Sequence, residues 1–103
     1  MLVRVRFFGE FRELLNKETV TLNVRENGKV KDVIYELARQ TDPKILGRIL
    51  NEKGEVRSEI IILVKGRNIQ NFKGLETKVE ENDVVYIFPI ATGGGTTNKT
   101  SSL

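Results

Sequence analysis

The residues that most often carry out chemistry are missing from this sequence. None of its 103 residues is histidine or cysteine. Their absence excludes the usual general base, a thiolate nucleophile, disulfides, thiolate zinc sites and iron–sulfur clusters. The prominent feature is instead a run of glycines, Gly93–Gly95, just beyond an apolar stretch that closes in Phe88-Pro89. We therefore expect no catalytic residue and no metal site, and a protein that is carried, bound or recognised by others.

Composition and charge describe one ordinary domain. Hydrophobic residues make up 39% of the chain and charged residues 30%, enough for a single modest core. The net charge of +3 comes from 17 basic residues scattered among 14 acidic ones, so a nucleic-acid surface is not favoured. No apolar run approaches the roughly 18 residues that span a bilayer, and the N-terminus has no secretory h-region. We expect no membrane association and a cytoplasmic location.

Two stretches near the start predict strands with one buried face. Apolar residues alternate with charged ones in Val3–Phe7 and with polar ones in Thr19–Val24. The segment between them, Gly9–Glu18, is too long for a tight hairpin. Its apolar residues indicate a helical turn that plugs one end of the core, namely Phe11, Leu14 and Leu15.

The hydrophobic period then changes to that of a helix. One apolar stripe predicts a helix over Lys29–Gln40, formed by Val30, Val33, Ile34, Leu37 and Ala38. A second, short helix is predicted to follow, because Asp42 can cap a helix and Pro43 suits its first position. Glu52–Arg57 is polar and is expected to form a surface loop.

A second group of strands is predicted in the rest of the chain. Ile60–Val64 and Val84–Phe88 are apolar on both faces. Lys65–Asn68 predicts a turn into a short strand at Ile69–Phe72, and the segment up to the polar turn at 81–83 is expected to tuck in Leu75 and Val79.

This order of elements predicts an α+β fold of the ubiquitin-like β-grasp type. One main helix would cross one face of a mixed four- to five-stranded sheet, with the first and last strands paired at its centre. The domain would span residues 1–89. The strands that are apolar on both faces would leave an apolar patch on the open face, which usually marks a partner surface. Flanking loops or a dimer could also cover that patch.

Four side chains are candidates for partner contact on the open face. We expect Tyr86 and Phe88 to point outward from the last strand. Arg4 and Arg6 would share the outer face of the first strand and help to dock an acidic enzyme surface. The alternative for both arginines is an ordinary solvated face.

Several segments together resemble the MoaD/ThiS family of ubiquitin-like sulfur carriers, which includes the small archaeal modifier proteins. The resemblance runs over about residues 1–94, through Val3–Phe8 with Phe11–Leu14, Val30–Leu37, Val64–Arg67, Glu81–Val85 and Phe88–Gly94. A Gly-Gly pair alone is weak evidence, but at this offset from a strand closing in Phe-Pro it is strong. The chain departs from the family at Ile90, where a second proline is common, and in running on beyond Gly94.

The resemblance implies a chemistry for the glycines. In this family an ATP-dependent activating enzyme adenylates the terminal glycine carboxylate. The acyl-adenylate then becomes a sulfur-donating thiocarboxylate or is passed to a lysine amine as an isopeptide. Glycines at 93 and 94, preceded by the small Ala91 and Thr92, would let the backbone enter a narrow channel. The arm of residues 90–94 would reach roughly 17 Å when extended. The alternative is a flexible linker to a disordered tail.

Residues 95–103 require an explanation, because an internal Gly94 has no free carboxyl group to adenylate. We expect a precursor that a protease cleaves between Gly94 and Gly95, since the polar tail is an accessible site. The alternatives are an artefact, or a β-grasp protein that is not activated and serves as a binding module.

Two functions of different kinds are open, and the tail favours the first. The first is a ubiquitin-like modifier attached to lysines of target proteins. The second is a sulfur carrier that works with a molybdopterin synthase-type large subunit or in thiamine or tRNA thiolation. A third possibility is an RNA-binding β-grasp module. In either of the first two, the chain itself would bind no cofactor, and the activating enzyme would use ATP.

Overall fold

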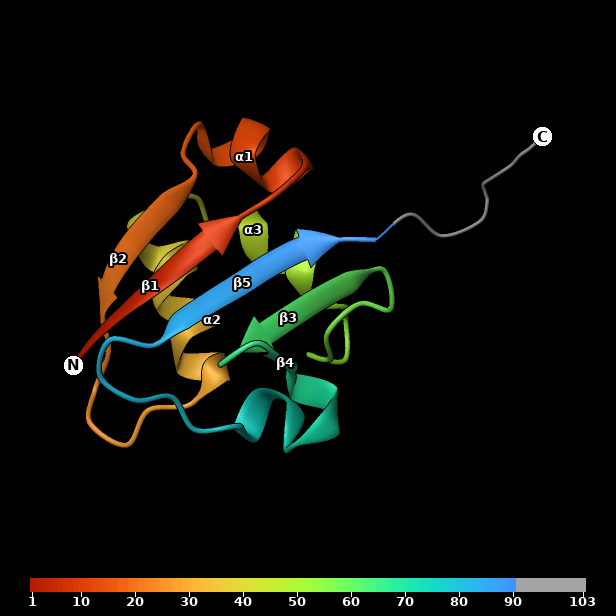
Figure 1. Ribbon diagram of the computed structural model, residues 1–103. Helices are drawn as coiled ribbons and strands as arrows, with labels where there is room; N and C mark the ends of the chain where they lie inside the picture. The colour runs from red at the N-terminus through yellow and green to blue at the C-terminus, as the bar shows by residue number, and fades with distance from the viewer. Residues whose placement is uncertain (91–103) are drawn as a thin grey trace.

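Five strands form one mixed sheet in the computed structural model, which describes residues 1–90 (Figure 1). The strands are β1 (Leu2–Phe7), β2 (Thr19–Asn23), β3 (Ile60–Val64), β4 (Arg67–Asn68) and β5 (Val84–Pro89). The helices are α1 (Glu10–Leu15), α2 (Val30–Gln40) and α3 (Ile45–Ile49), with 3₁₀ turns η1 (Ile69–Asn71) and η2 (Gly74–Glu76). No helix in this part of the chain is long and apolar enough to cross a membrane.

The strand order is β2-β1-β5-β3-β4, with β5 in the middle of the sheet. β1 and β5 run parallel, with Val5 opposite Val85, and the other neighbours are antiparallel. The predicted central pairing of the first and last strands is confirmed.

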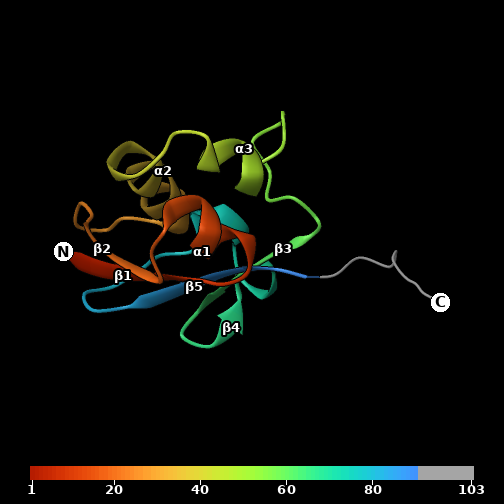
Figure 2. The same cartoon turned by 90° about the horizontal axis from the view of Figure 1, so that it is seen from above.

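Helix α2 covers one face of this sheet (Figure 2). Its apolar stripe is buried as predicted. It packs on the alternate residues of β1 and β5 that point the same way, which are fully or almost fully buried: Val3, Val5, Phe7, Val85 and Ile87. α3 lies on the same side, and Phe11 of α1 closes one end of the core as expected. The β-grasp prediction is confirmed.

The short strand predicted at Ile69–Phe72 is wrong. The turn between β3 and β4 needs only Lys65 and Gly66, which have φ angles of 54° and 76°. Positive φ at both positions is typical of the two-residue turn that suits a hairpin. β4 therefore comes earlier, and the side chain of Asn68 then accepts a hydrogen bond from the Gln70 N–H (2.9 Å). That bond curls the chain into η1 and leaves Phe72 48% exposed.

The start of α3 also differs from the prediction. The Asp42 carboxylate accepts a hydrogen bond from the Lys44 N–H (3.0 Å), but α3 begins only at Ile45. Pro43 therefore lies in the turn before the helix. Asp42 makes a capping type of bond, but the helix begins two residues later than the predicted first position at Pro43.

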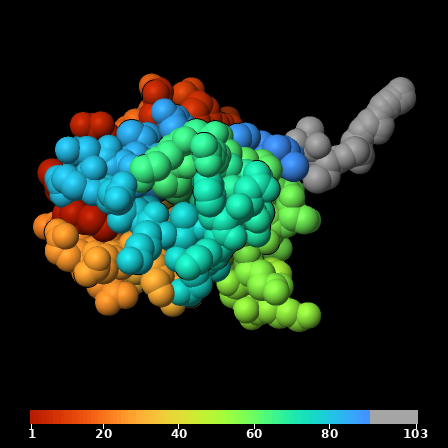
Figure 3. All heavy atoms as spheres, turned by 60° about the horizontal axis from the view of Figure 1, so that its bottom comes forward, coloured from red at the N-terminus to blue at the C-terminus, as the bar shows by residue number. Residues whose placement is uncertain are grey.

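The segment from η2 to Val79 lies against the residues that lead into α2 (Figure 3). Val30 N–H donates to the Thr77 carbonyl (2.9 Å), and Val79 N–H donates to the Gly28 carbonyl (3.1 Å). Leu75 and Val79 are tucked in as predicted, the first partly and the second almost fully.

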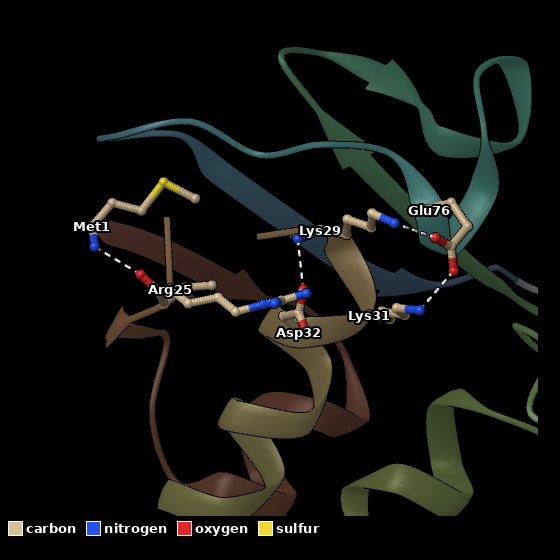
Figure 4. A network of polar contacts seen from close by, with 7 residues as sticks. Met1, Arg25, Lys29, Lys31, Asp32 and Glu76 are labelled. Atoms are coloured by element: carbon tan, nitrogen blue, oxygen red, sulfur yellow. Dashed lines mark hydrogen bonds and ion pairs between the residues drawn. The ribbon is translucent and has the colours of Figure 1, made fainter. Parts of the chain in front are cut away.

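Glu76 links η2 to the N-terminus of α2 (Figure 4). Its two carboxylate oxygens accept from Lys29 Nζ (2.7 Å) and Lys31 Nζ (2.8 Å). These hydrogen bonds lower the pKa of Glu76 to about 2, and the one from Lys29 contributes more than the one from Lys31. The network helps to fix the connection between β4 and β5 against the main helix.

Candidate functional site

Three aromatic rings form a cluster on the open face of the sheet. Phe8 follows the last residue of β1, while Tyr86 and Phe88 belong to β5. The Phe8 ring is stacked on Tyr86 at a centroid distance of 6.1 Å and meets Phe88 edge-on at 5.9 Å. Such geometries are favourable for aromatic pairs. Tyr86 and Phe88 therefore point outward as predicted, and they share one apolar surface.

The parallel register of β1 and β5 brings these rings together. Arg6 lies opposite Tyr86 in the ladder, so the chain after Phe7 continues beside the end of β5. The Phe8 N–H donates to the Ile87 carbonyl (3.3 Å), which extends this pairing by one residue. Sequence reasoning missed Phe8, because the alternating pattern ends at Phe7 and only the register places the next residue.

An open hollow of about 450 Å³ lies over this cluster. Its lining is almost wholly apolar and comes from the ends of β1 and β5 and from β3: Phe8, Gly9, Leu63, Tyr86, Phe88 and Pro89. Within residues 1–90, no α-helix covers this side of the sheet (Figure 2). An exposed apolar surface of this kind is suited to a protein partner.

Arginines surround the aromatic cluster. The guanidinium of Arg12 lies 5.4 Å from the centre of the Phe8 ring, and that of Arg6 lies 5.9 Å from it. Arg12 Nε also donates to the Phe7 carbonyl (3.1 Å), which holds its side chain in place. Arg4 and Arg6 are exposed and form no ion pair within residues 1–90. The predicted basic outer face is present. Arg12 of α1, which the sequence pattern did not single out, lies beside it and is paired with Glu18 (3.3 Å).

The exit of the chain from β5 is closely held. Gly9 has φ of 62°, and a Cβ there would lie only 2.9 Å from Cγ of Pro89. Glycine is therefore required for β5 and the turn after β1 to approach this closely. The Ile90 N–H donates to the Glu59 carbonyl (2.8 Å). The chain thus leaves the sheet from a fixed point at the edge of the hollow.

The remaining predicted site residues lie outside the described residues. These are the arm residues Ala91, Thr92, Gly93 and Gly94, and Gly95 at the expected cleavage point. Their roles stay predictions, as does the division of the chain into arm and tail. Within residues 1–90, no group of histidine, cysteine, aspartate and glutamate side chains could hold a metal ion.

The family model described as the ThiS family matches residues 5–94. The chain belongs to the ThiS family. The match covers the β-grasp domain and ends at Gly94, the second glycine of the predicted arm.

Proteins similar to this ThiS-family chain include a small archaeal modifier protein and a putative sulfur carrier protein. Small archaeal modifier protein 3 of Haloferax volcanii is 32% identical over 91% of this chain and 100% of its own length. A putative sulfur carrier protein of Archaeoglobus fulgidus is 43% identical, over 56% of this chain and 66% of its own. The crystal structure of SAMP1 from Haloferax volcanii has a TM-score of 0.79 at 22% identity, covering 91% of this chain and all of that one. The similarity to the SAMP1 structure supports the fold alone.

Proposed function

We propose that this chain is a ubiquitin-like protein modifier, activated at the carboxyl group of Gly94 after cleavage between Gly94 and Gly95. One observation carries the proposal: the aromatic hollow lies where the chain leaves β5 toward the two glycines. A partner bound on Phe8, Tyr86 and Phe88 would hold the arm at a fixed starting point. The ThiS-family match, which ends at Gly94, and the relative named as a modifier support the same reading.

The proposed chemistry needs only a free carboxylate on a thin arm. In the active site of an activating enzyme, the Gly94 carboxylate attacks the α-phosphate of ATP, and pyrophosphate leaves. The amine of a target lysine then attacks the acyl carbon, AMP leaves, and an isopeptide bond forms. ATP would be bound by the activating enzyme. This chain contributes the docking surface and the arm, with Arg4, Arg6 and Arg12 facing an acidic rim on the enzyme.

A sulfur carrier is the second candidate, favoured by the relative named a putative sulfur carrier. The same acyl-adenylate would react with a sulfur donor, and the resulting Gly94 thiocarboxylate would be consumed by a molybdopterin synthase-type large subunit or a thiolation enzyme. The modifier stands first because its relative aligns with most of this chain, whereas the carrier relative aligns with little more than half. A β-grasp binding module that is never activated is the third candidate.

Pyrophosphate exchange with the activating enzyme tests the shared first step. We expect exchange with protein ending at Gly94 and none with protein ending at Leu103, because only the former has the glycine carboxylate. Equal exchange from both, or none from either, would refute activation at Gly94.

Peptide mapping separates modifier from carrier. The chain has no lysine or arginine between Lys78 and Gly94, so trypsin would leave the segment 79–94 on a modified target lysine. Finding that branched segment supports the modifier. Finding a Gly94 thiocarboxylate and no branched peptides would instead support the sulfur-carrier function.

A further inference from the structure

A second exposed surface surrounds Phe72, at the other end of the sheet from the arm. Two hollows share this residue together with Thr77 and Lys78, one of about 650 Å³ and one of about 410 Å³. The first also reaches Lys29, Lys73 and Glu76, and the second reaches Val64, Lys65 and Arg67. We call this the Phe72 surface. It lies on the segment from β4 to η2, coloured green to teal in Figure 3.

The Phe72 ring is held in an exposed position. Phe72 follows η1, is 48% exposed, and lies 5.7 Å below the guanidinium of Arg67. Arg67 comes from β4, so the sheet edge fixes one side of the ring. A large exposed aromatic residue beside a cation is typical of the anchors found at protein interfaces.

Positive charge is in excess around this ring. Three carboxylate groups are already paired with neighbouring lysines. Glu76 is paired with Lys29 and Lys31 (Figure 4), and Lys65 is paired with Glu80 at 2.8 Å and with Asp83 at 3.0 Å. The other basic residues of the Phe72 surface have no carboxylate partner within residues 1–90, namely Arg67, Lys73 and Lys78. Three cations are therefore left for a ligand.

The Phe72 surface and the arm can be used at the same time. Arg67 pairs with Val64, which lies opposite Val85 near the start of β5. The arm leaves from Pro89, four residues further along β5. At about 3.3 Å per residue these points are roughly 13 Å apart along the strand. A partner on the Phe72 surface would leave the exit of the chain from β5 at Pro89 accessible.

We propose that the Phe72 surface binds an acidic, extended peptide segment of a partner protein, one that carries an apolar side chain among its carboxylates. The apolar side chain packs on the Phe72 ring, and the carboxylates pair with Arg67, Lys73 and Lys78. A nucleic acid fits less well, because there is one exposed ring to stack on and Glu76 stands within the surface. This inference concerns a different surface from the proposed activation and does not depend on it.

Titration of the isotope-labelled full chain, followed by backbone amide NMR, tests this proposal. The probe is a short peptide in which glutamate alternates with leucine. We expect saturable shifts confined to Arg67, Phe72 and Lys78 and their neighbours, which weaken as salt is added because the contacts are ionic. A peptide with lysine in place of glutamate should produce no such shifts.

Matched variants make the test specific. Phe72→Ala and Lys78→Glu should each weaken peptide binding by about tenfold, as loss of an anchor or of a charge pair does. Lys17→Glu makes the same charge change at an exposed residue just before β2, at the opposite edge of the sheet from β4, and should leave affinity within about twofold. Unchanged spectral dispersion will show that the variants are folded.

Three results would overturn the proposal. Tighter binding of polyuridylate than of the acidic peptide at these residues would make this a nucleic-acid surface. Shifts at Phe8 and Tyr86 instead would assign the peptide to the aromatic hollow. Equal affinity of Phe72→Ala, Lys78→Glu and the unaltered chain would show that the surface is merely solvated.

Discussion

Phe88→Ala tests the role of the aromatic hollow in activation. Phe88 lines the hollow and makes an edge-on contact with Phe8, but it is only partly buried. The backbone of β5 and the arm beyond it are untouched by this substitution. It therefore alters the docking surface while leaving the reacting carboxylate in place.

The structure sets different magnitudes for stability and for docking. Loss of the edge-on pair costs about 0.5–1.5 kcal/mol. Because Phe88 is partly buried, some apolar burial is lost as well, and we expect the free energy of unfolding to fall by about 2 kcal/mol in all. A small domain with about 5–15 kcal/mol of stability remains folded after such a loss. Truncation of an aromatic anchor in a protein interface costs about 2 kcal/mol or more, which is roughly a 30-fold loss of affinity.

Pyrophosphate exchange measures the docking effect. With protein ending at Gly94, Phe88→Ala should raise KM roughly 30-fold and leave kcat nearly unchanged, because binding rather than the reacting group is altered. Tyr35→Ala is the matched control. Tyr35 is 53% exposed on α2, on the opposite side of the sheet, and its loss should leave KM within about twofold.

A docking role for Phe88 is refuted if Phe88→Ala has the KM of the unaltered protein while remaining folded. It is also refuted if Tyr35→Ala raises KM as much, since docking would then involve the helical side. Urea unfolding of both variants, measured in parallel, separates loss of docking from loss of folded protein.

Three further predictions concern the exit of β5, the Glu76 network and the arm. Gly9→Ala should destabilise the fold by about 1–3 kcal/mol, because φ is 62° and the new Cβ would meet Pro89 at 2.9 Å. Gly47→Ala, with nothing within 4 Å, should be neutral or slightly stabilising in the same urea experiment. The pKa of Glu76 is lowered from 4.5 to about 2, so its contribution to stability is present above pH 4.5 and is lost as the pH falls toward 2. Urea midpoints over this range should fall less steeply for Glu76→Gln than for Glu52→Gln, an exposed control, and equal slopes would contradict the network's role. Gly94→Val, in protein ending at that residue, should abolish pyrophosphate exchange without changing the urea midpoint, whereas normal exchange would contradict a narrow channel.

The outward direction of Tyr86 and Phe88 could be predicted because a strand alternates its side chains between two faces. Once Val85 and Ile87 belong to the core, their neighbours must lie on the open face, and the structure has both of them fully buried. The buried face of α2 could be predicted in the same way, because the helical period of its apolar residues fixes which side packs on the sheet.

Residues placed by non-local geometry could not be predicted. Phe8 reaches the aromatic cluster through the register of β1 with β5, and Arg12 reaches it because α1 turns back over the end of β1. Around Phe72, apolar content suggested a strand, but the side-chain hydrogen bond of Asn68 to the Gln70 N–H curls the chain into a 3₁₀ turn. Local hydrogen bonding of this kind competes with strand pairing and leaves little trace in hydrophobic patterning.

The intact mass of the protein recovered from the cells that make it shows whether Gly94 becomes the C-terminal residue. We predict a chain ending at Gly94, lighter by the residues Gly95–Leu103, as a free acid, a thiocarboxylate or an adduct on another protein. A population that retains Leu103 throughout would contradict it, because the Gly94 carboxyl would then never be free to react.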